Sequence, residues 1–347
     1  MNKIGSTLFL TVLAFIPAWS QDSRNPFVGR WDLTVTDGEM KYASWLEVTE
    51  RAGKLEARAQ QTEGHAMPVV AIRAEGQRLV LTVAGARPAR PAEGGRGPVP
   101  ASPETVWDLT EKGGKLSGVS THGSTTWQLA GVRAPALKRP TPAQWGPPEP
   151  LFNGRDLTGW QPINNTAGIA RSRAASRWTV KNGELVNEAH GSNLRTTRTF
   201  DDFKLHLEYN ASSGGSGGVY LRGRYEAQVS APPAPVNPAA TKRGPRGGGY
   251  SNPFPNRFGF VGCIYGMLGP ASPPPFRSDW QVYDITLVGR MATVVFNGVT
   301  TVANGEIAGV TGGALDSNEG EPGPICLQGD HSGEVRYRNI TISLPKK

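Results

Sequence analysis

Apolar and polar residues alternate along most of the chain with the two-residue period of a β-strand. In the first part of the chain, short alternating runs separated by turn residues occupy residues 30–35, 45–48, 78–83, 106–109, 115–119 and 126–129. Several short strands with turn signals between them are typical of a β-sandwich or a β-barrel. We therefore predict a small all-β domain over residues 21–134, built as a barrel or as a sandwich.

The opening of this domain, Gly29-Arg30-Trp31, is similar to the G-x-W opening of lipocalin-type up-and-down barrels. An ordinary small β-domain with a buried tryptophan fits the same tripeptide, so both interpretations stay open. A Pro-, Gly- and Arg-rich stretch over 85–103 is expected to be a mobile loop. Six prolines between 135 and 150 predict a semi-rigid linker, because proline restricts the backbone and lacks an amide donor.

The second block, 151–347, is also rich in alternating runs, at 204–209, 218–222, 225–229 and 335–342. Asn297-Gly298 between two apolar runs predicts a β-hairpin, because both residues tolerate the positive φ of a type I′ turn. Residues 231–258 are rich in Pro and Gly and show no periodicity, which predicts a loop. No stretch has a sustained helical period, so the sequence indicates an all-β protein.

The segment 219–229 carries polar residues at alternate positions. If Gly223-Arg224-Tyr225 forms a three-residue hairpin loop, Arg222 lies opposite Glu226. Residues opposite each other share a face of the sheet, so one face becomes polar and the other apolar. The polar face carries Tyr220, Arg222, Glu226 and Gln228. It is either a pocket wall or a solvated surface with an ion pair.

A series of motifs in the second block resembles the 3-keto-disaccharide hydrolase family. The series comprises LFNGRDLTGW (151–160), RWTVKNGELV (177–186), LRTTRTFDDFKLHLEY (194–209), SGGVYLRGRYEAQV (216–229), GCIYG (262–266), DWQVYDITL (279–287), VFNGV (295–299) and GPICLQGDHSGEVRYRNITI (323–342). The resemblance implies a concanavalin A-like jelly-roll sandwich with the ligand on one sheet, and an activity on glycosides oxidised at C3, such as 3-keto-trehalose. It covers residues of about 151–345 and leaves the N-terminal block unexplained.

The chain departs from the family pattern around the expected pocket. Gly215 stands where the family usually has Asn before Ser-Gly, and Leu327-Gln328-Gly329-Asp330-His331-Ser332-Gly333 carries inserted residues relative to the usual Leu-Gln-Asp-His-Gly signature. These differences concern the choice of substrate more than the fold.

A ketone at C3 of a sugar acidifies the hydrogen at C2, so one base can form an enolate and the C1 substituent can leave by β-elimination. Water adding back gives net hydrolysis, whereas release of the unsaturated sugar is a lyase outcome. His331 or Glu226 is the candidate base. Arg222 is the candidate group for the enolate oxygen, and Tyr265 or Tyr220 the candidate proton donor.

Gln228, Gln328 and Asp330 complete the set of candidate substrate-binding residues. The sequence shows no metal-ligand spacing of the His-x-His or Cys-x-x-Cys kind. It therefore predicts no definite cofactor and leaves open a divalent metal ion held by Glu226, Asp279, Asp330 and His331.

Composition adds the cellular context. Lys3, an apolar run over 8–17 and Ala18-Trp19-Ser20 predict a signal peptide over residues 1–20, hence export to the periplasm or the medium and no membrane span in the mature chain. The formal net charge of +8 is scattered, which argues against a nucleic-acid partner. Cys263 and Cys326 are expected on neighbouring strands facing the pocket, either as a disulfide or as two thiols. The oligomeric state stays open.

Two functions follow from the sequence. The first is an exported enzyme that cleaves 3-keto-glycosides, with an oxidised carbohydrate as its partner. The alternative is a non-catalytic, lectin-like glycan-binding module, because a sandwich fold does not by itself fix a function.

Overall fold

The computed structural model describes residues 25–61, 64–85, 100–163, 175–188, 190–232, 261–270 and 274–346. The predicted signal peptide and most of the two predicted loops, 85–103 and 231–258, lie outside these residues. All regular structure in the described part is β-strand, as predicted. None of the described residues forms a helix with the length and apolar character needed to cross a membrane.

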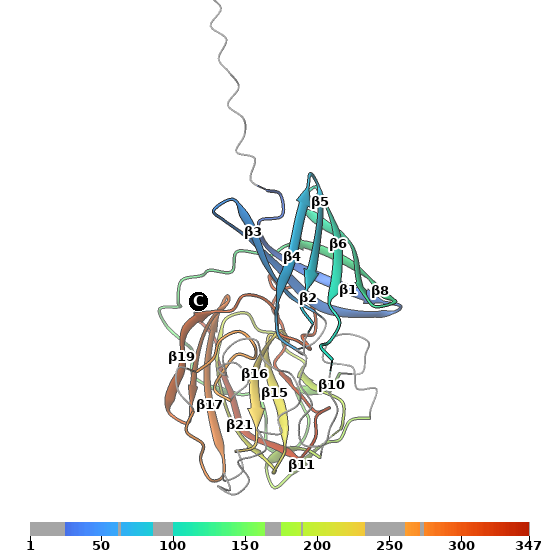
Figure 1. Cartoon of the computed structure of the whole chain (residues 1–347). Coiled ribbons are helices and arrows are strands. Elements are labelled where there is room, and N and C mark those ends of the chain that lie inside the picture. The colour runs from blue at the N-terminus through green and yellow to red at the C-terminus, as the bar shows by residue number, and fades with distance from the viewer. Residues whose placement is uncertain are drawn as a thin grey trace, which may run out of the picture.

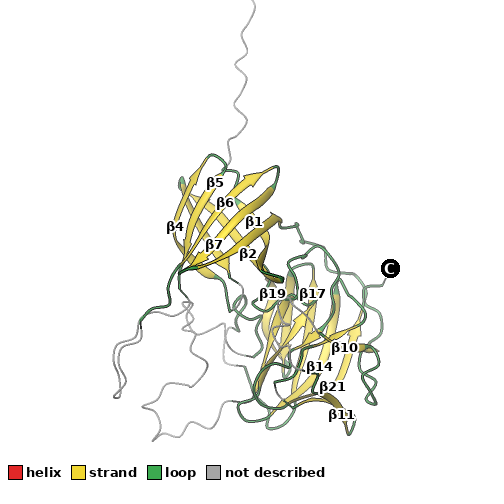
Figure 2. Ribbon diagram, turned by 90° about the vertical axis from the view of Figure 1, so that its right-hand side faces the viewer, coloured by secondary structure: helices red, strands yellow, loops and turns green. Residues whose placement is uncertain are grey.

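The first eight strands close into an antiparallel barrel in which each strand pairs with the next and β8 returns to β1 (Figures 1 and 2). The barrel strands are β1 (Gly29–Asp37), β2 (Met40–Arg51), β3 (Lys54–Gln60), β4 (Met67–Glu75), β5 (Arg78–Val83), β6 (Thr105–Lys112), β7 (Lys115–His122) and β8 (Thr125–Arg133). Alternate side chains of these strands fill the interior, including Trp31, Leu46, Leu81 and Trp107. Of the two predicted forms, the barrel is the one observed.

The Gly29-x-Trp31 opening has a physical reason. Trp31 is fully buried, and the Arg133 guanidinium stacks on its ring at 3.7 Å from the centroid. A Cβ on Gly29 would lie 2.9 Å from Arg133 Nη1, and Gly29 has a φ of 122°. Glycine at this position therefore lets the last strand close the barrel over the tryptophan.

The remaining strands form two stacked antiparallel sheets, which we call the sandwich. One sheet has the order β10–β13–β20–β15–β16, and the other the order β11–β12–β21–β14–β17–β18–β19 with β9 added beside β21. The strands are β9 (Glu149–Pro150), β10 (Trp160–Pro162), β11 (Trp178–Lys181), β12 (Glu184–Asn187), β13 (Leu194–Thr196), β14 (Phe203–Ala211), β15 (Ser216–Leu221), β16 (Tyr225–Ser230), β17 (Gln281–Val288), β18 (Met291–Phe296), β19 (Val299–Glu306), β20 (Cys326–Leu327) and β21 (Val335–Ser343).

The main core lies between the two sheets and takes the apolar side of every long strand, for example Leu205, Val219, Ala227 and Ile285. The predicted hairpin at Asn297-Gly298 is present: Phe296 pairs with Val299, and both turn residues have positive φ. The fold class predicted for the chain is confirmed.

The proline-rich segment before the sandwich lies against it. Trp145 forms a bridge with Pro345, and Glu149 and Pro150 pair with Ile342 and Thr341 of β21. Earlier in the segment, Leu137 is buried and its carbonyl accepts a hydrogen bond from Arg290 N at 3.2 Å. This segment therefore contributes backbone pairing to the sandwich.

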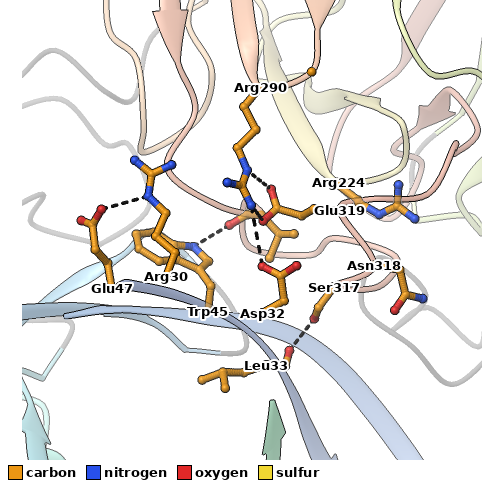
Figure 3. Close-up of polar contacts among 12 residues, drawn as sticks. Arg30, Asp32, Leu33, Trp45, Glu47, Arg224, Arg290, Ser317, Asn318 and Glu319 are labelled. Atoms are coloured by element: carbon orange, nitrogen blue, oxygen red, sulfur yellow. Dashed lines mark hydrogen bonds and ion pairs between the residues drawn. The ribbon is translucent and has the colours of Figure 1, made fainter. Parts of the chain in front are cut away.

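The outer side of β2 packs against the stretch 307–319, which joins β19 to β20 in the sandwich. An apolar cluster joins Ala43, Trp45 and Ala66 of the barrel to Ala308, Val310 and Ala314. Beside it, Arg290 pairs with Glu319 and lies 3.9 Å from Asp32 of the barrel (Figure 3). The barrel and the sandwich therefore share a buried junction.

Candidate functional site

The β15–β16 hairpin carries the polar face that the sequence predicts. Tyr220 lies directly opposite Glu226, and Gly218 opposite Gln228. The alternate residues Val219, Leu221, Ala227 and Val229 enter the core between the sheets. The polar face of this hairpin therefore points away from the main core, on the outer side of the five-stranded sheet.

The same register continues across the whole sheet. Gln161 on β10 faces Arg195 on β13, Arg195 faces Cys326 on β20, Cys326 faces Tyr220, and Tyr220 faces Glu226. Because directly opposed residues share a sheet face, this row spans five strands on the outer side. Glu226 stands at its end, on the edge strand β16.

Glu226 is almost completely buried, with 6% of its surface exposed. Its carboxyl oxygen Oε2 accepts a hydrogen bond from the Tyr220 hydroxyl at 3.0 Å. Burial raises the pKa of Glu226 to about 7, and the nearby Asp330 charge acts in the same direction, whereas the Tyr220 hydrogen bond and His331 oppose the rise. A carboxyl group with such a pKa changes its protonation state near neutral pH.

The backbone around Glu226 is fixed from two sides. Its amide donates to Thr311 Oγ1 at 3.0 Å, and its carbonyl accepts from Tyr265 N at 2.8 Å. Gly218 on the neighbouring strand leaves the space that the side chain fills, because a Cβ there would lie 2.6 Å from Glu226 Cγ. The carboxyl group is therefore held in one place.

The Tyr220 hydroxyl has two acceptors within reach. It lies 3.0 Å from Glu226 Oε2 and 2.9 Å from the carbonyl oxygen of Gly312. A phenol has one proton to donate, so it serves one acceptor at a time. Burial raises the pKa of Tyr220 well above its usual value, and the Glu226 charge raises it further, so the hydroxyl stays protonated at neutral pH.

His331 and Asp330 lie in the turn between β20 and β21. The Nδ1 atom of His331 lies 2.9 Å from Asp330 Oδ1, and the imidazole is partly open to solvent. This contact orients the imidazole ring through Nδ1, so the second ring nitrogen, Nε2, is not the atom that faces Asp330. Both residues lie near enough to Glu226 to influence its pKa, His331 lowering it and Asp330 raising it.

The side-chain amides of the two predicted glutamines differ in their hydrogen bonds. Gln228 donates its amide to the carbonyls of Gly217 and Val229, both at 3.1 Å. Gln328 is buried, and its Oε1 atom accepts no hydrogen bond from the described residues. A buried amide oxygen without a donor is energetically costly. Tyr265 is half-buried, in the loop that holds the Glu226 carbonyl.

The prediction that Arg222 lies opposite Glu226 is wrong. Leu221 pairs with Tyr225, so the hairpin loop is Arg222–Gly223–Arg224 and Arg222 leaves the strand with a φ of 53°. Its guanidinium donates to Asp201, to the Tyr225 hydroxyl and to the carbonyl of Gly289, at 3.0–3.2 Å. Because Tyr225 packs in the core, it stays in the strand and the loop moves back by one residue.

The expectation for the cysteines also needs correction. Cys263 lies in a loop rather than a strand, beside Tyr209 and Tyr283, whereas Cys326 lies on the outer side of β20 with Tyr220. Both are buried, and neither forms a disulfide. Within the part of the chain that the structure describes, no three His, Cys, Asp or Glu side chains come together as metal ligands. Asp279 instead accepts a hydrogen bond from Asn210 at 2.7 Å.

Sequence reasoning missed the stretch 311–313, which contacts both Tyr220 and Glu226. Thr311 and Gly312 provide the acceptors described above, and Gly313 lies so close that a Cβ there would be 2.8 Å from the Tyr220 hydroxyl. The Gly312-Gly313 pair is the sequence signal for a close backbone approach. It is a weak signal in a chain with 44 glycines.

A family model described as a 3-keto-alpha-glucoside-1,2-lyase-like domain matches residues 147–343. A protein of Bacteroides thetaiotaomicron named 3-keto-disaccharide hydrolase is 25% identical over 79 residues, which is 20% of this chain and 25% of that protein. The match thus spans about a quarter of the relative's length.

Two crystal structures of provisionally named glycosyl hydrolases from Parabacteroides distasonis are also similar. One is 25% identical with a TM-score of 0.41, over 56% of this chain and 82% of the other. The second is 17% identical with a TM-score of 0.42, over 57% and 93%. The family model covers more than half of the sequence, and it includes the whole Tyr220–Glu226 face and the Asp330-His331 turn. The chain therefore belongs to the 3-keto-alpha-glucoside-1,2-lyase-like family.

Proposed function

We propose that this protein cleaves 3-keto-glycosides, with Glu226 as the base that removes the C2 proton. The observation that carries the proposal is the buried Glu226 carboxyl, whose pKa is raised to about 7. A base with a pKa near the working pH combines an adequate ionised fraction with a strong drive to accept a proton. Family membership supports a carbohydrate as the substrate.

The proposed reaction uses the residues around that carboxylate. Glu226 takes the proton from C2, and the electron pair forms an enolate with the C3 ketone. The enolate then re-forms the ketone as the C1–O bond breaks, which leaves a C1=C2 double bond. The departing oxygen takes a proton from His331, whose ring is oriented by Asp330.

Tyr220 and Gln328 have supporting roles. The Tyr220 hydroxyl holds the Glu226 carboxylate in position, and Gln328 binds a sugar hydroxyl through its unpaired oxygen. Addition of water across C1=C2 gives 3-keto-glucose and net hydrolysis. Release of the unsaturated sugar gives a lyase. We also propose that the chain is exported and that residues 1–20 are its signal peptide.

The experiment follows the C2 proton directly. Purified protein is incubated in D2O with 3-keto-trehalose or a 3-keto-β-glucoside, with and without added divalent ions or a chelator, and the products are analysed by NMR and mass spectrometry. We expect release of the alcohol, deuterium at C2 of recovered substrate, and no cleavage of the parent glycoside that lacks the ketone. Glu226→Gln should reduce both exchange and cleavage at least about a hundredfold.

The control variant is Glu208→Gln, on the outer side of β14, whose carboxylate pairs with Arg338. It should leave exchange and cleavage unchanged. Binding of 3-keto-glycosides without exchange or cleavage under any of these conditions would contradict the proposal and identify the protein as a glycan-binding module.

A further inference from the structure

Trp45 lies on the outer side of the barrel, yet only 1% of its surface is exposed. Its indole Nε1 donates a hydrogen bond to the carbonyl of Val310 at 2.9 Å (Figure 3). The backbone beside Val310 lies flat on the ring, because a Cβ on Gly309 would be 2.6 Å from Trp45 Cγ. The barrel thus fixes the position of Val310 by a hydrogen bond and by close packing.

A second contact fixes the same stretch seven residues later. The Ser317 hydroxyl donates to the carbonyl of Leu33 (Figure 3). It also accepts a hydrogen bond from the amide of Ser44 at 3.3 Å. Two residues further on, Glu319 accepts two hydrogen bonds from Arg290, at 3.0 and 2.6 Å. Both ends of the segment 310–319 are therefore anchored at the barrel junction.

Between these anchors, polar groups of the segment form hydrogen bonds with residues of the site. Thr311 Oγ1 accepts the Glu226 amide, and Thr311 N donates to the carbonyl of Arg224 at 2.9 Å. The carbonyl of the next residue, Gly312, accepts from the Tyr220 hydroxyl. Thr311, the first residue that contacts Glu226, therefore directly follows Val310, whose carbonyl Trp45 holds.

A further barrel contact reaches the site through the Tyr265 loop. A Cβ on Gly266 would lie 2.5 Å from the Cβ of His65, which is buried in the turn before β4. Gly266 follows Tyr265, whose amide donates to the Glu226 carbonyl at 2.8 Å. The barrel therefore supports both backbone contacts of Glu226.

We propose that Trp45 is a positioning residue for Glu226, so that the barrel is part of the catalytic unit. Trp45 acts through Val310, which sets where Thr311 and Gly312 meet Glu226 and Tyr220. The proposal rests on the proposed role of Glu226 as the base and assigns the N-terminal barrel a task in the same reaction.

The chemical consequence follows from the single proton of Tyr220. When Glu226 is ionised, the Tyr220 hydroxyl donates to the carboxylate. When Glu226 is protonated, its own O–H can donate to Tyr220, whose proton then turns to the Gly312 carbonyl. A well-placed Gly312 thus stabilises the protonated form, and a displaced Gly312 also admits water to the carboxyl group.

Both effects lower the pKa of Glu226 when the segment is loosened. Among the described residues, the titratable groups that act on Glu226 or respond to its charge are Tyr220, Tyr283, Asp330, His331 and Tyr337. None of them belongs to the barrel, so a change at Trp45 reaches Glu226 through the segment.

The test compares Trp45→Phe, which keeps an aromatic ring but loses the indole N–H, with Trp127→Phe on the barrel strand β8. Trp127 is a half-buried barrel tryptophan that stacks on His122 and packs on the barrel core, and it does not belong to the apolar cluster of the junction. The readouts are the pH profile of kcat/KM and a 13C NMR titration of Glu226, identified by the signal that Glu226→Gln removes.

For Trp45→Phe we expect the acid limb and the titration midpoint to fall by at least half a pH unit, with kcat reduced about tenfold and KM changed less than threefold. Gly309→Ala, which displaces the segment while keeping every barrel side chain, should give the same shift. Trp127→Phe should give none.

Folded Trp45→Phe and Gly309→Ala proteins with unchanged titration midpoints would overturn the proposal and leave the junction a purely structural contact. If the wild type shows no turnover, the NMR titration still decides the positioning role, so failure of the proposed function is distinguished from failure of this inference.

Discussion

Tyr220 and Glu226 lie directly opposite each other on β15 and β16, and the Tyr220 hydroxyl reaches Glu226 Oε2 at 3.0 Å. This pair sits on the outer side of the five-stranded sheet, where 1% of Tyr220 and 6% of Glu226 is exposed. Its partners include a carbonyl from the segment that also contacts the barrel.

Tyr220→Phe removes the hydroxyl that stabilises the Glu226 carboxylate. The pKa of Glu226 should therefore rise, which moves the acid limb of kcat/KM to higher pH, opposite to the shift expected for Trp45→Phe. Tyr209→Phe is the matched control, because its hydroxyl binds the Ser230 carbonyl at 3.3 Å within the core. An acid limb that shifts equally in both variants would contradict the prediction.

Gly218→Ala places a methyl group against Glu226. Gly218 needs no positive φ, but the new Cβ would lie 2.6 Å from Glu226 Cγ and Oε1, so the carboxyl group must move. We expect a tenfold or larger loss of kcat in a folded protein. Gly217→Ala is the control, because its Cβ would have no contact closer than 3.4 Å. Equal kinetics of the two variants would show that the position of Glu226 does not matter.

The raised pKa of Glu226 should also make the free energy of unfolding depend on pH. Its folded pKa of about 7 lies above the usual 4.5, so the native state binds more protons than the unfolded state between these pH values. The free energy of unfolding therefore falls as pH rises from about 4.5 through about 7, by an amount on the order of 3 kcal/mol.

Glu226→Gln removes this contribution. The difference in unfolding free energy between variant and wild type, measured with urea at pH 4.5 and pH 8, should grow with pH in favour of the variant. A constant difference would indicate an ordinary pKa for Glu226.

Arg222→Gln should affect stability rather than chemistry. The buried guanidinium holds Tyr225 and the Gly289 carbonyl, and its loss leaves them without donors, at a cost of about 2 kcal/mol or more. Turnover per folded molecule should stay within about twofold. Arg155→Gln, at an exposed position, should change neither quantity. A hundredfold loss of turnover in folded Arg222→Gln would restore the catalytic role that the sequence suggested.

The two cysteines should be present as thiols rather than as a disulfide, and both should react slowly. Titration with a thiol reagent under denaturing conditions, without reductant, should find two thiols per chain, and the native protein should react much more slowly because both are buried. Burial also raises the pKa of Cys326, so its side chain stays protonated, and the protonated form reacts slowly. A count of zero in the denatured protein would mean a disulfide.

The alternating pattern was sufficient to predict which residues share the polar face. Tyr220, Glu226 and Gln228 are on the face expected for them because alternation fixes parity, and the register error changes the loop without changing parity. The position of Arg222 was predicted wrongly because Tyr225 stays in the strand and is buried in the core, which puts Arg222 in the loop. The burial of Tyr225 cannot be recognised from the local sequence pattern.

The contacts of the segment 307–319 could not be predicted from the sequence. Trp45 meets a carbonyl 265 residues further along the chain, and no local pattern couples such distant positions. In β2, the alternating pattern assigns Ala43 and Trp45 to the outside of the barrel, where side chains are normally in contact with solvent. Only the assembled structure shows that another part of the chain covers them.

This separation in sequence also orders the events of folding. The barrel consists of strands that each pair with the next, so it can close as soon as residue 133 has been synthesised. The residues that cover Trp45 come more than 170 positions later, in a stretch that ends only about 30 residues before the C-terminus. During that interval the barrel presents an uncovered tryptophan and a carboxyl group, Asp32, that still lacks Arg290. A chain interrupted before residue 310 would therefore carry a finished barrel with an apolar patch that its own sequence can no longer cover, and such a patch favours association with other chains.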